Sequence, residues 1–148
     1  CRLGSSIDGI NPQPGHYSGI VNKVKRSETK CDVMLNRVYS DNPEIYPIEF
    51  NEKCKPHYYK GALTVNPGVT YHFYRQDRNG NWSHKDGNGR ANNVDASNNI
   101  ITNPQTANRF YTKKRHYKDF CGFFCIPSDY VKQTNMSRRD PKNNNKLY

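Results

Sequence analysis

The chain lacks the features that would place it across a membrane or among nucleotide-dependent enzymes. No apolar run approaches the roughly 18–20 residues needed to cross a bilayer, and no signal-peptide pattern stands at its start. The sequence also lacks a glycine-rich phosphate loop, a dinucleotide-binding fingerprint, an EF-hand loop and a His-Glu-x-x-His motif. We therefore expect no membrane span, no cofactor and no nucleotide-dependent chemistry.

Apolar residues are scarce as well. They make up 33% of 148 residues, against roughly 45–50% in ordinary globular domains. The 11 tyrosines compensate in part, because each can bury its ring while the hydroxyl stays in water. This length suits one domain with a thin core. We predict a single compact domain over residues 1–126, followed by a basic, polar C-terminal tail over residues 127–148.

Cysteine is present in an odd number, five, at irregular spacing. This is not a recognisable disulfide framework, and it predicts a reducing compartment such as the cytoplasm. Cys121 and Cys125 could suggest zinc, with His116 and either Cys54 or His57 as further ligands. On an unbroken strand, however, both thiols would face the same side about 13 Å apart. We therefore predict buried structural thiols and no metal site.

Acidic residues are few relative to basic ones, so that the net charge is +10. Residues 109–148 hold ten Lys or Arg but only three Asp. This excess predicts an acidic protein surface, a neighbouring subunit of an assembly or, nonspecifically, nucleic acid as the partner. The alternative is a solvated basic face that only keeps the protein soluble. The predicted partner-binding residues are Lys113, Lys114, Arg115, Lys118, Arg138 and Arg139.

Local patterns predict one helix followed by several strands. Ser27 can cap a helix over residues 27–39, in which apolar side chains recur at helical spacing. Asn66-Pro67-Gly68 and Asn79-Gly80 are turn signals between aromatic runs. This order predicts an α+β fold with one N-terminal helix and a mainly antiparallel sheet. The predicted strands cover residues 45–50, 58–65, 69–76, 82–85 and 120–126.

The hairpin around Asn79-Gly80 contains the most informative histidine. Alternation places His72 and Gln76 on the same face of their strand. A four-residue loop over residues 78–81 would pair Gln76 with Ser83 and bring Ser83 to that face. His72 could then act as a general base that a polar neighbour orients. The alternative is a half-buried sheet histidine whose hydrogen bonds are met by a neighbour.

A longer string of motifs resembles a known group of proteins. The segments are residues 72–77 (HFYRQD), 79–85 (NGNWSHK), 93–97 (NVDAS), 100–104, 107–109 and 120–125 (FCGFFC). They resemble a poorly characterised family of bacteria and large DNA viruses. Upstream, residues 12–19 follow Cys1 at a spacing similar to that of papain-like NlpC/P60 and CHAP-type thiol hydrolases.

The resemblance implies a papain-like, NlpC-type fold and hydrolysis of amide bonds. Cys1 would be the nucleophile and His72 the base that generates its thiolate. Ser83, Gln76 and Asp95 would be candidate orienters of the imidazole. The domain could be an active hydrolase, or it could retain the fold without turnover.

A non-enzymatic role is the alternative. The viral members of the resembling family and the basic C-terminal arm suggest a structural or assembly protein, such as a minor capsid protein in a virion. Such a protein would use the arm to contact neighbouring subunits or nucleic acid. Because residue 1 is Cys rather than Met, we also expect a processed or truncated chain.

Overall fold

The computed structural model describes residue 14, residues 24–86 and residues 89–128. These ranges contain one 3₁₀ turn, one α-helix and eight β-strands. The elements are η2 (Arg26–Glu28), α1 (Cys31–Asp41), β1 (Tyr46–Ile48), β2 (Tyr58–Asn66), β3 (Thr70–Gln76), β4 (Trp82–Lys85), β5 (Ala91–Asn92), β6 (Phe110–Thr112), β7 (Arg115–His116) and β8 (Asp119–Pro127).

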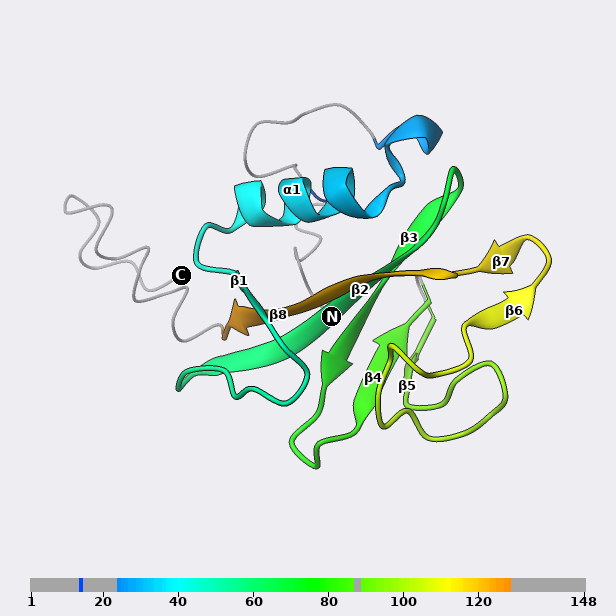
Figure 1. The fold of residues 1–148 in the computed structure, drawn as a ribbon. Helices are drawn as coiled ribbons and strands as arrows, with labels where there is room; N and C mark the ends of the chain where they lie inside the picture. The colour runs from blue at the N-terminus through cyan, green and yellow to red at the C-terminus, as the bar shows by residue number, and fades with distance from the viewer. Residues whose placement is uncertain (1–13, 15–23, 87–88, 129–148) are drawn as a thin grey trace.

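Six of the strands form one antiparallel sheet in the order β1-β8-β2-β3-β4-β5. Strands β6 and β7 form a separate two-stranded ribbon. Figure 1 shows α1 lying across one face of the large sheet. The predicted papain-like α+β fold is wrong: the described part of the chain is mostly antiparallel sheet, and its single helix has 11 residues.

The face of the sheet beneath α1 holds the first half of the core. Met34 and Val38 are one helical turn apart and both are buried. They pack against Leu63 and Val65, which alternate along β2, and against Phe124 of β8. The apolar side chains that recur at the helical period in α1 therefore pack on those that alternate along β2, and together they form one apolar layer.

The opposite face holds the second half of the core and the histidines of the hairpin. Ala62, Tyr74, Trp82 and Phe123 pack there, and the loop after β5 covers them with Ile101. Trp82 and Ala62 are fully buried. A long irregular segment thus provides the second covering layer, where a second helix or sheet would be more usual.

Two disulfides cross-link these elements, and each has one of its cysteines in β8. Cys31 of α1 is bonded to Cys121, and Cys54 of the loop before β2 is bonded to Cys125. The predicted free thiols are therefore wrong. The two β8 cysteines do not share a face, because a β-bulge shifts the β2–β8 register at Leu63/Thr64 and leaves Cys121 without a partner on β2.

The bulge reverses the alternation of side chains along β8. Cys121 lies with the core under α1, whereas Cys125 is next to Phe124 and points to the other face. The predicted reducing compartment is wrong for the same reason. Disulfides form and persist in oxidising environments and are rare in the cytosol.

Most element positions follow the local patterns. The five predicted strands correspond to β1, β2, β3, β4 and β8, with ends that agree within two residues. The helix begins at Cys31 rather than at Ser27, because residues 26–28 form the separate turn η2. Glu28 is the last residue of that turn, and its side chain binds the buried Arg37, at 2.6 Å between Oε2 and Nη2. The predicted tail over residues 127–148 stays a prediction, since residues 129–148 lie outside the described ranges.

A substitution at Gly61 of β2 can test how tightly the first core layer is packed. A Cβ at this position would lie 2.7 Å from Ile126 Cδ1 and 3.0 Å from Phe124 Cε2. Both neighbours are fully buried, so we expect Gly61→Ala to lower the free energy of unfolding by about 1–3 kcal/mol. Urea denaturation measures this change. Gly68→Asn is the control, because Gly68 has φ +74° and open space around it and Asn tolerates that conformation; equal losses would contradict the packing explanation.

Candidate functional site

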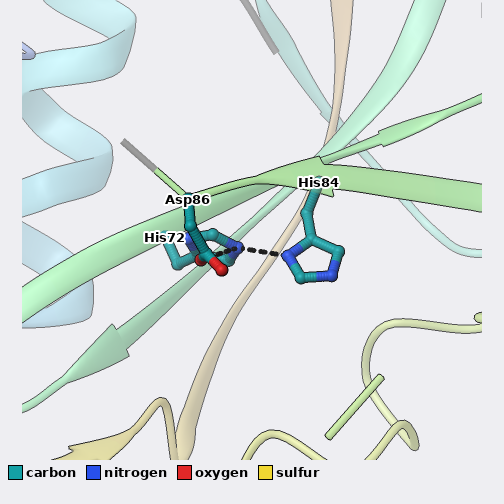
Figure 2. A group of neighbouring side chains, drawn as sticks. All are labelled: His72, His84 and Asp86. Atoms are coloured by element: carbon teal, nitrogen blue, oxygen red, sulfur yellow. Dashed lines mark hydrogen bonds and ion pairs between the residues drawn. The ribbon is translucent and has the colours of Figure 1, made fainter. Parts of the chain in front are cut away.

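A pair of buried histidines lies on the second face of the sheet. His72 comes from the middle of β3 and His84 from β4, and the register places Tyr74 opposite His84. His72 and His84 are therefore diagonal neighbours across the two strands. Their side chains are joined at 2.8 Å between His72 Nε2 and His84 Nδ1 (Figure 2). Asp86, just after β4, lies beside them with its Oδ1 3.9 Å from His72 Nε2.

The hydrogen bonds determine where the protons of the pair lie. His84 Nε2 is 2.8 Å from the carbonyl oxygen of Val94, and a carbonyl can only accept, so this nitrogen carries the proton. The other ring nitrogen of His84, Nδ1, is then the acceptor of the pair. His72 consequently donates its Nε2–H to His84 Nδ1. The pair is a directional chain from His72 through His84 to the Val94 carbonyl.

Aromatic rings enclose the pair and keep water out. Tyr117 stacks on His72, with ring centroids 4.7 Å apart, and Tyr74 meets the same ring edge-on at 5.1 Å. His72 is 6% exposed and His84 is 2% exposed. Burial, followed by the neighbouring His84, lowers the pKa of His72 to about 4. His72 is therefore neutral at physiological pH.

Asp86 is the charged member of the group and has a cationic partner. Its Oδ1 forms an ion pair with Arg115, which β7 brings to the end of β4. Burial alone would raise the pKa of Asp86, but the hydrogen bond and charge of Arg115 outweigh this and hold the pKa below its usual value. Two imidazoles beside an ionised carboxylate can form a hydrogen-bonded support for the sheet or can bind a metal ion.

The predicted orienters Ser83 and Gln76 form their hydrogen bonds elsewhere. Ser83 Oγ donates to Asp77 Oδ1 at 2.9 Å, and Gln76 Nε2 donates to the carbonyl of Gly80 at 3.1 Å. For Ser83 the reason is the register: Gln76 pairs with Trp82 rather than with Ser83. A shift of one residue moves a side chain to the opposite face, so that His84 and not Ser83 shares the face of His72.

The other two predicted catalytic residues are Asp95 and Cys1. Asp95 organises a loop, in which its carboxylate accepts hydrogen bonds from the backbone N–H groups of Ser97, Asn99 and Asn108. These bonds hold the pKa of Asp95 below its usual value against the opposing effect of burial. Cys1, the predicted nucleophile, lies outside the described residues. The Cys1–His72 pairing stays a prediction.

His84 and Asp86 were not predicted as site residues. Both lie within or directly after the hairpin motif, and the signal that finds them is the register of that hairpin. A five-residue connection over residues 77–81, closed by the hydrogen bond from Asp77 N to Asn81 O at 2.7 Å, places His84 next to His72. The four-residue loop that was predicted over residues 78–81 would instead bring Ser83 to the face of His72.

The predicted cationic residues divide into three groups. Lys113, Lys114 and Lys118 are exposed. Arg115 is engaged with Asp86 and therefore belongs to the histidine group. Arg138 and Arg139 lie outside the described residues. In the part of the chain that the structure describes, no helix is both long and apolar enough to span a bilayer.

Comparison with known proteins gives a single informative match. No family model matches the chain, and no solved structure matches it significantly. Insoluble matrix shell protein 1 of Ruditapes philippinarum is 50% identical over 65 residues, which cover 44% of this chain. The match spans 40% of the length of that relative.

These findings bear on the predicted virion location. The similarity is to a shell protein, and the two disulfides indicate an oxidising environment. The predicted location, a reducing cytoplasm or a virion, is therefore wrong.

Proposed function

We propose that this chain is a non-enzymatic structural domain of an extracellular protein matrix, in which it binds acidic neighbouring components. The observation that carries the proposal is the 50% identity over 65 residues to a protein named for an insoluble shell matrix. A partial match of this kind supports a shared building block, and the role of the block in a matrix is our inference from that name.

The cross-linked framework supports an extracellular role. The disulfides join residues 90 and 71 positions apart in the sequence, so they connect α1 and the loop before β2 to β8, an interior strand of the sheet. A thin core stabilised by such links is typical of secreted domains.

A concentration of exposed cations supplies the binding surface. The side chain of Asn66 donates to the carbonyl of Lys114 at 3.1 Å, which holds the β6–β7 turn against the β2–β3 turn. Gly68 N donates to the carbonyl of Thr29 at 3.4 Å, which brings the start of α1 to the same end of the sheet (Figure 1). We name this surface the basic end; its exposed residues are Lys25, Arg26, Lys30, Lys113 and Lys114.

The nearby acidic groups offset this charge only in part. Glu28 is bound to Arg37, while Asp32 and Asp119 remain exposed at this end. An acidic polypeptide or polysaccharide would therefore meet a net positive surface. Exposed charge pairs are individually weak, so binding should depend on several cations together and should weaken as salt is added.

A charge-matched pair of variants tests this surface. We expect Lys113→Ala/Lys114→Ala to weaken binding to immobilised polyaspartate by about tenfold at low salt, because two exposed cations contribute roughly 0.5–1 kcal/mol each. The control is Lys53→Ala/Arg78→Ala, which removes the same charge from exposed positions at the opposite end of β2 and β3. Biosensor titration over a range of salt concentrations measures both variants.

The proposal also requires co-assembly. Mixed with polyaspartate, the parent protein should sediment as an insoluble complex, and the Lys113/Lys114 variant should remain in the supernatant. No binding at low salt, or equal losses in both double variants, would overturn the role of the basic end. Preferential binding to DNA over polyaspartate at equal charge would instead support the nucleic-acid alternative.

A further inference from the structure

We propose that His72, His84 and Asp86 form a binding site for a divalent transition-metal ion, of which Zn²⁺ is the expected occupant. The ligand atoms would be His72 Nε2, His84 Nδ1 and a carboxylate oxygen of Asp86. These three donor atoms all lie within 4.8 Å of one another. Imidazole nitrogen and carboxylate oxygen are ligands that Zn²⁺ prefers. The sequence motifs do not predict a metal site at these three residues.

The orientation of His84 is that of a metal ligand. Its Nε2–H donates to the Val94 carbonyl, and this bond directs the Nδ1 lone pair toward His72 and Asp86. Metal-binding histidines almost always have the non-ligating nitrogen fixed by such a bond to a carbonyl or a carboxylate. The loop that carries Val94 therefore acts as the outer support of the site.

The spacing needs only a small adjustment. Two ligands of a tetrahedral zinc, each about 2.0–2.1 Å from the metal, are separated by about 3.3 Å. His72 Nε2 and His84 Nδ1 are 2.8 Å apart, and His72 Nε2 is 3.9 Å from Asp86 Oδ1. Separating the two imidazoles by about half an ångström would admit the ion. Binding through His72 Nε2 requires the tautomer of His72 that carries its proton on Nδ1, so that the imidazole stays neutral.

Access to the site is from the side of Asp86. The side chain of Asp86 is 41% exposed, whereas both histidines are buried. Water could provide the fourth ligand on this open side, as it does where protein donors number three. The aromatic rings on the closed side hold both imidazoles in place and exclude competing solvent.

Arg115 is the residue that restrains metal binding. Its guanidinium is paired with Asp86 Oδ1 and lies close to where the ion would be. A positive charge there repels a divalent cation and competes for the carboxylate. Replacing Arg115 should therefore tighten binding, whereas replacing any other neighbour of a site normally weakens it. This opposite sign distinguishes a real site from nonspecific attachment.

The test uses the full chain with both disulfides intact and with Cys1→Ala, so that no free thiol can bind the ion. Calorimetric titration with Zn²⁺ should give one equivalent bound. We expect Asp86→Asn and His84→Gln each to raise the dissociation constant at least tenfold, and Arg115→Gln to lower it about threefold or more. Cu²⁺ should give an electron paramagnetic resonance spectrum with couplings from two imidazole nitrogens.

The control is His57→Asn, which removes an exposed histidine outside the proposed site. Metal binding unchanged by Asp86→Asn, or equally weakened by His57→Asn, would show attachment to the surface only and would overturn the proposal. If His84→Gln does not fold, the opposed effects of Asp86→Asn and Arg115→Gln still decide the matter, because both residues are partly exposed. Fluorescence of the buried Trp82 verifies the folding of every variant.

Discussion

Removal of either disulfide should lower the free energy of unfolding by about 4–5 kcal/mol. The bridges close loops of 90 and 71 residues in sequence separation, and in the chain-entropy model long loops restrict the unfolded chain most. Domains of this size have total stabilities of roughly 5–15 kcal/mol. We therefore expect Cys31→Ala/Cys121→Ala and Cys54→Ala/Cys125→Ala each to be marginally folded, and the variant that lacks both bridges to be unfolded.

Urea denaturation followed by Trp82 fluorescence measures this loss, because Trp82 is the only tryptophan and is fully buried. The parent protein under reducing conditions is the matched control, since it keeps every sulfur atom but loses the cross-links. If the reduced parent is as stable as the oxidised protein, the loss in the alanine variants comes from packing, and the bridges do not stabilise the fold.

Short-range features of this fold could be read from the sequence. The strands and the turns at Asn66-Pro67-Gly68 and Asn79-Gly80 depend on residues adjacent in the chain, and they occur where alternation and turn chemistry predict them. Glycines 68 and 80 have positive φ, as such turns require. Segments without such local signals, including β5, β6 and β7, were not predicted.

Long-range pairings could not be read in the same way. The partner of Cys121 is 90 residues away in the sequence, and an odd cysteine count suggested no partner at all. The bulge that turns Cys121 toward α1 arises from the β2–β8 register, which no local pattern specifies. The same difficulty affected the site, because one residue of hairpin register decides whether Ser83 or His84 faces His72.

The composition of the basic end is a third feature that the sequence alone could not predict. Its cations come from η2, from the start of α1 and from the β6–β7 turn, which are far apart in the sequence and meet only through hydrogen bonds of Asn66 and Gly68. The charge distribution along the chain therefore indicates Lys113 and Lys114 as binding residues, but it does not show that the N-terminal cations lie on the same surface. Tertiary structure decides which charges form one surface.

Acidification should destabilise the fold through His72 by about 3 kcal/mol between pH 7 and pH 4. The pKa of His72 is about 4 in the folded protein, below the ordinary histidine value of 6.5, chiefly because the ring is buried. Within that interval the unfolded chain binds a proton that folded His72 does not, so stability falls as the pH falls. Well above pH 6.5 neither state is protonated, and this contribution to stability is fully present.

The charged groups that face His72 do not reverse the direction of its pKa shift. Asp86 raises the pKa of His72, whereas His84 and Arg115 lower it together with burial. Tyr74 and Tyr117 pack on the ring, and burial raises the pKa of Tyr74 above its usual value, so this phenol carries no charge in this range. The net depression of the pKa thus belongs to the enclosed position of the ring and should disappear when the imidazole is replaced.

Urea denaturation of the parent and of His72→Gln from pH 7 to pH 4 measures the effect as a difference between two pH profiles. The variant should lose less stability on acidification, by about 3 kcal/mol, even if it is less stable at pH 7. His57→Asn is the control, because this exposed histidine has φ +66°, which Asn tolerates, and its profile should follow that of the parent. Parallel profiles for the parent and His72→Gln, or a His72 ring resonance that titrates near pH 6.5 in NMR spectra, would contradict the expected neutral, buried imidazole.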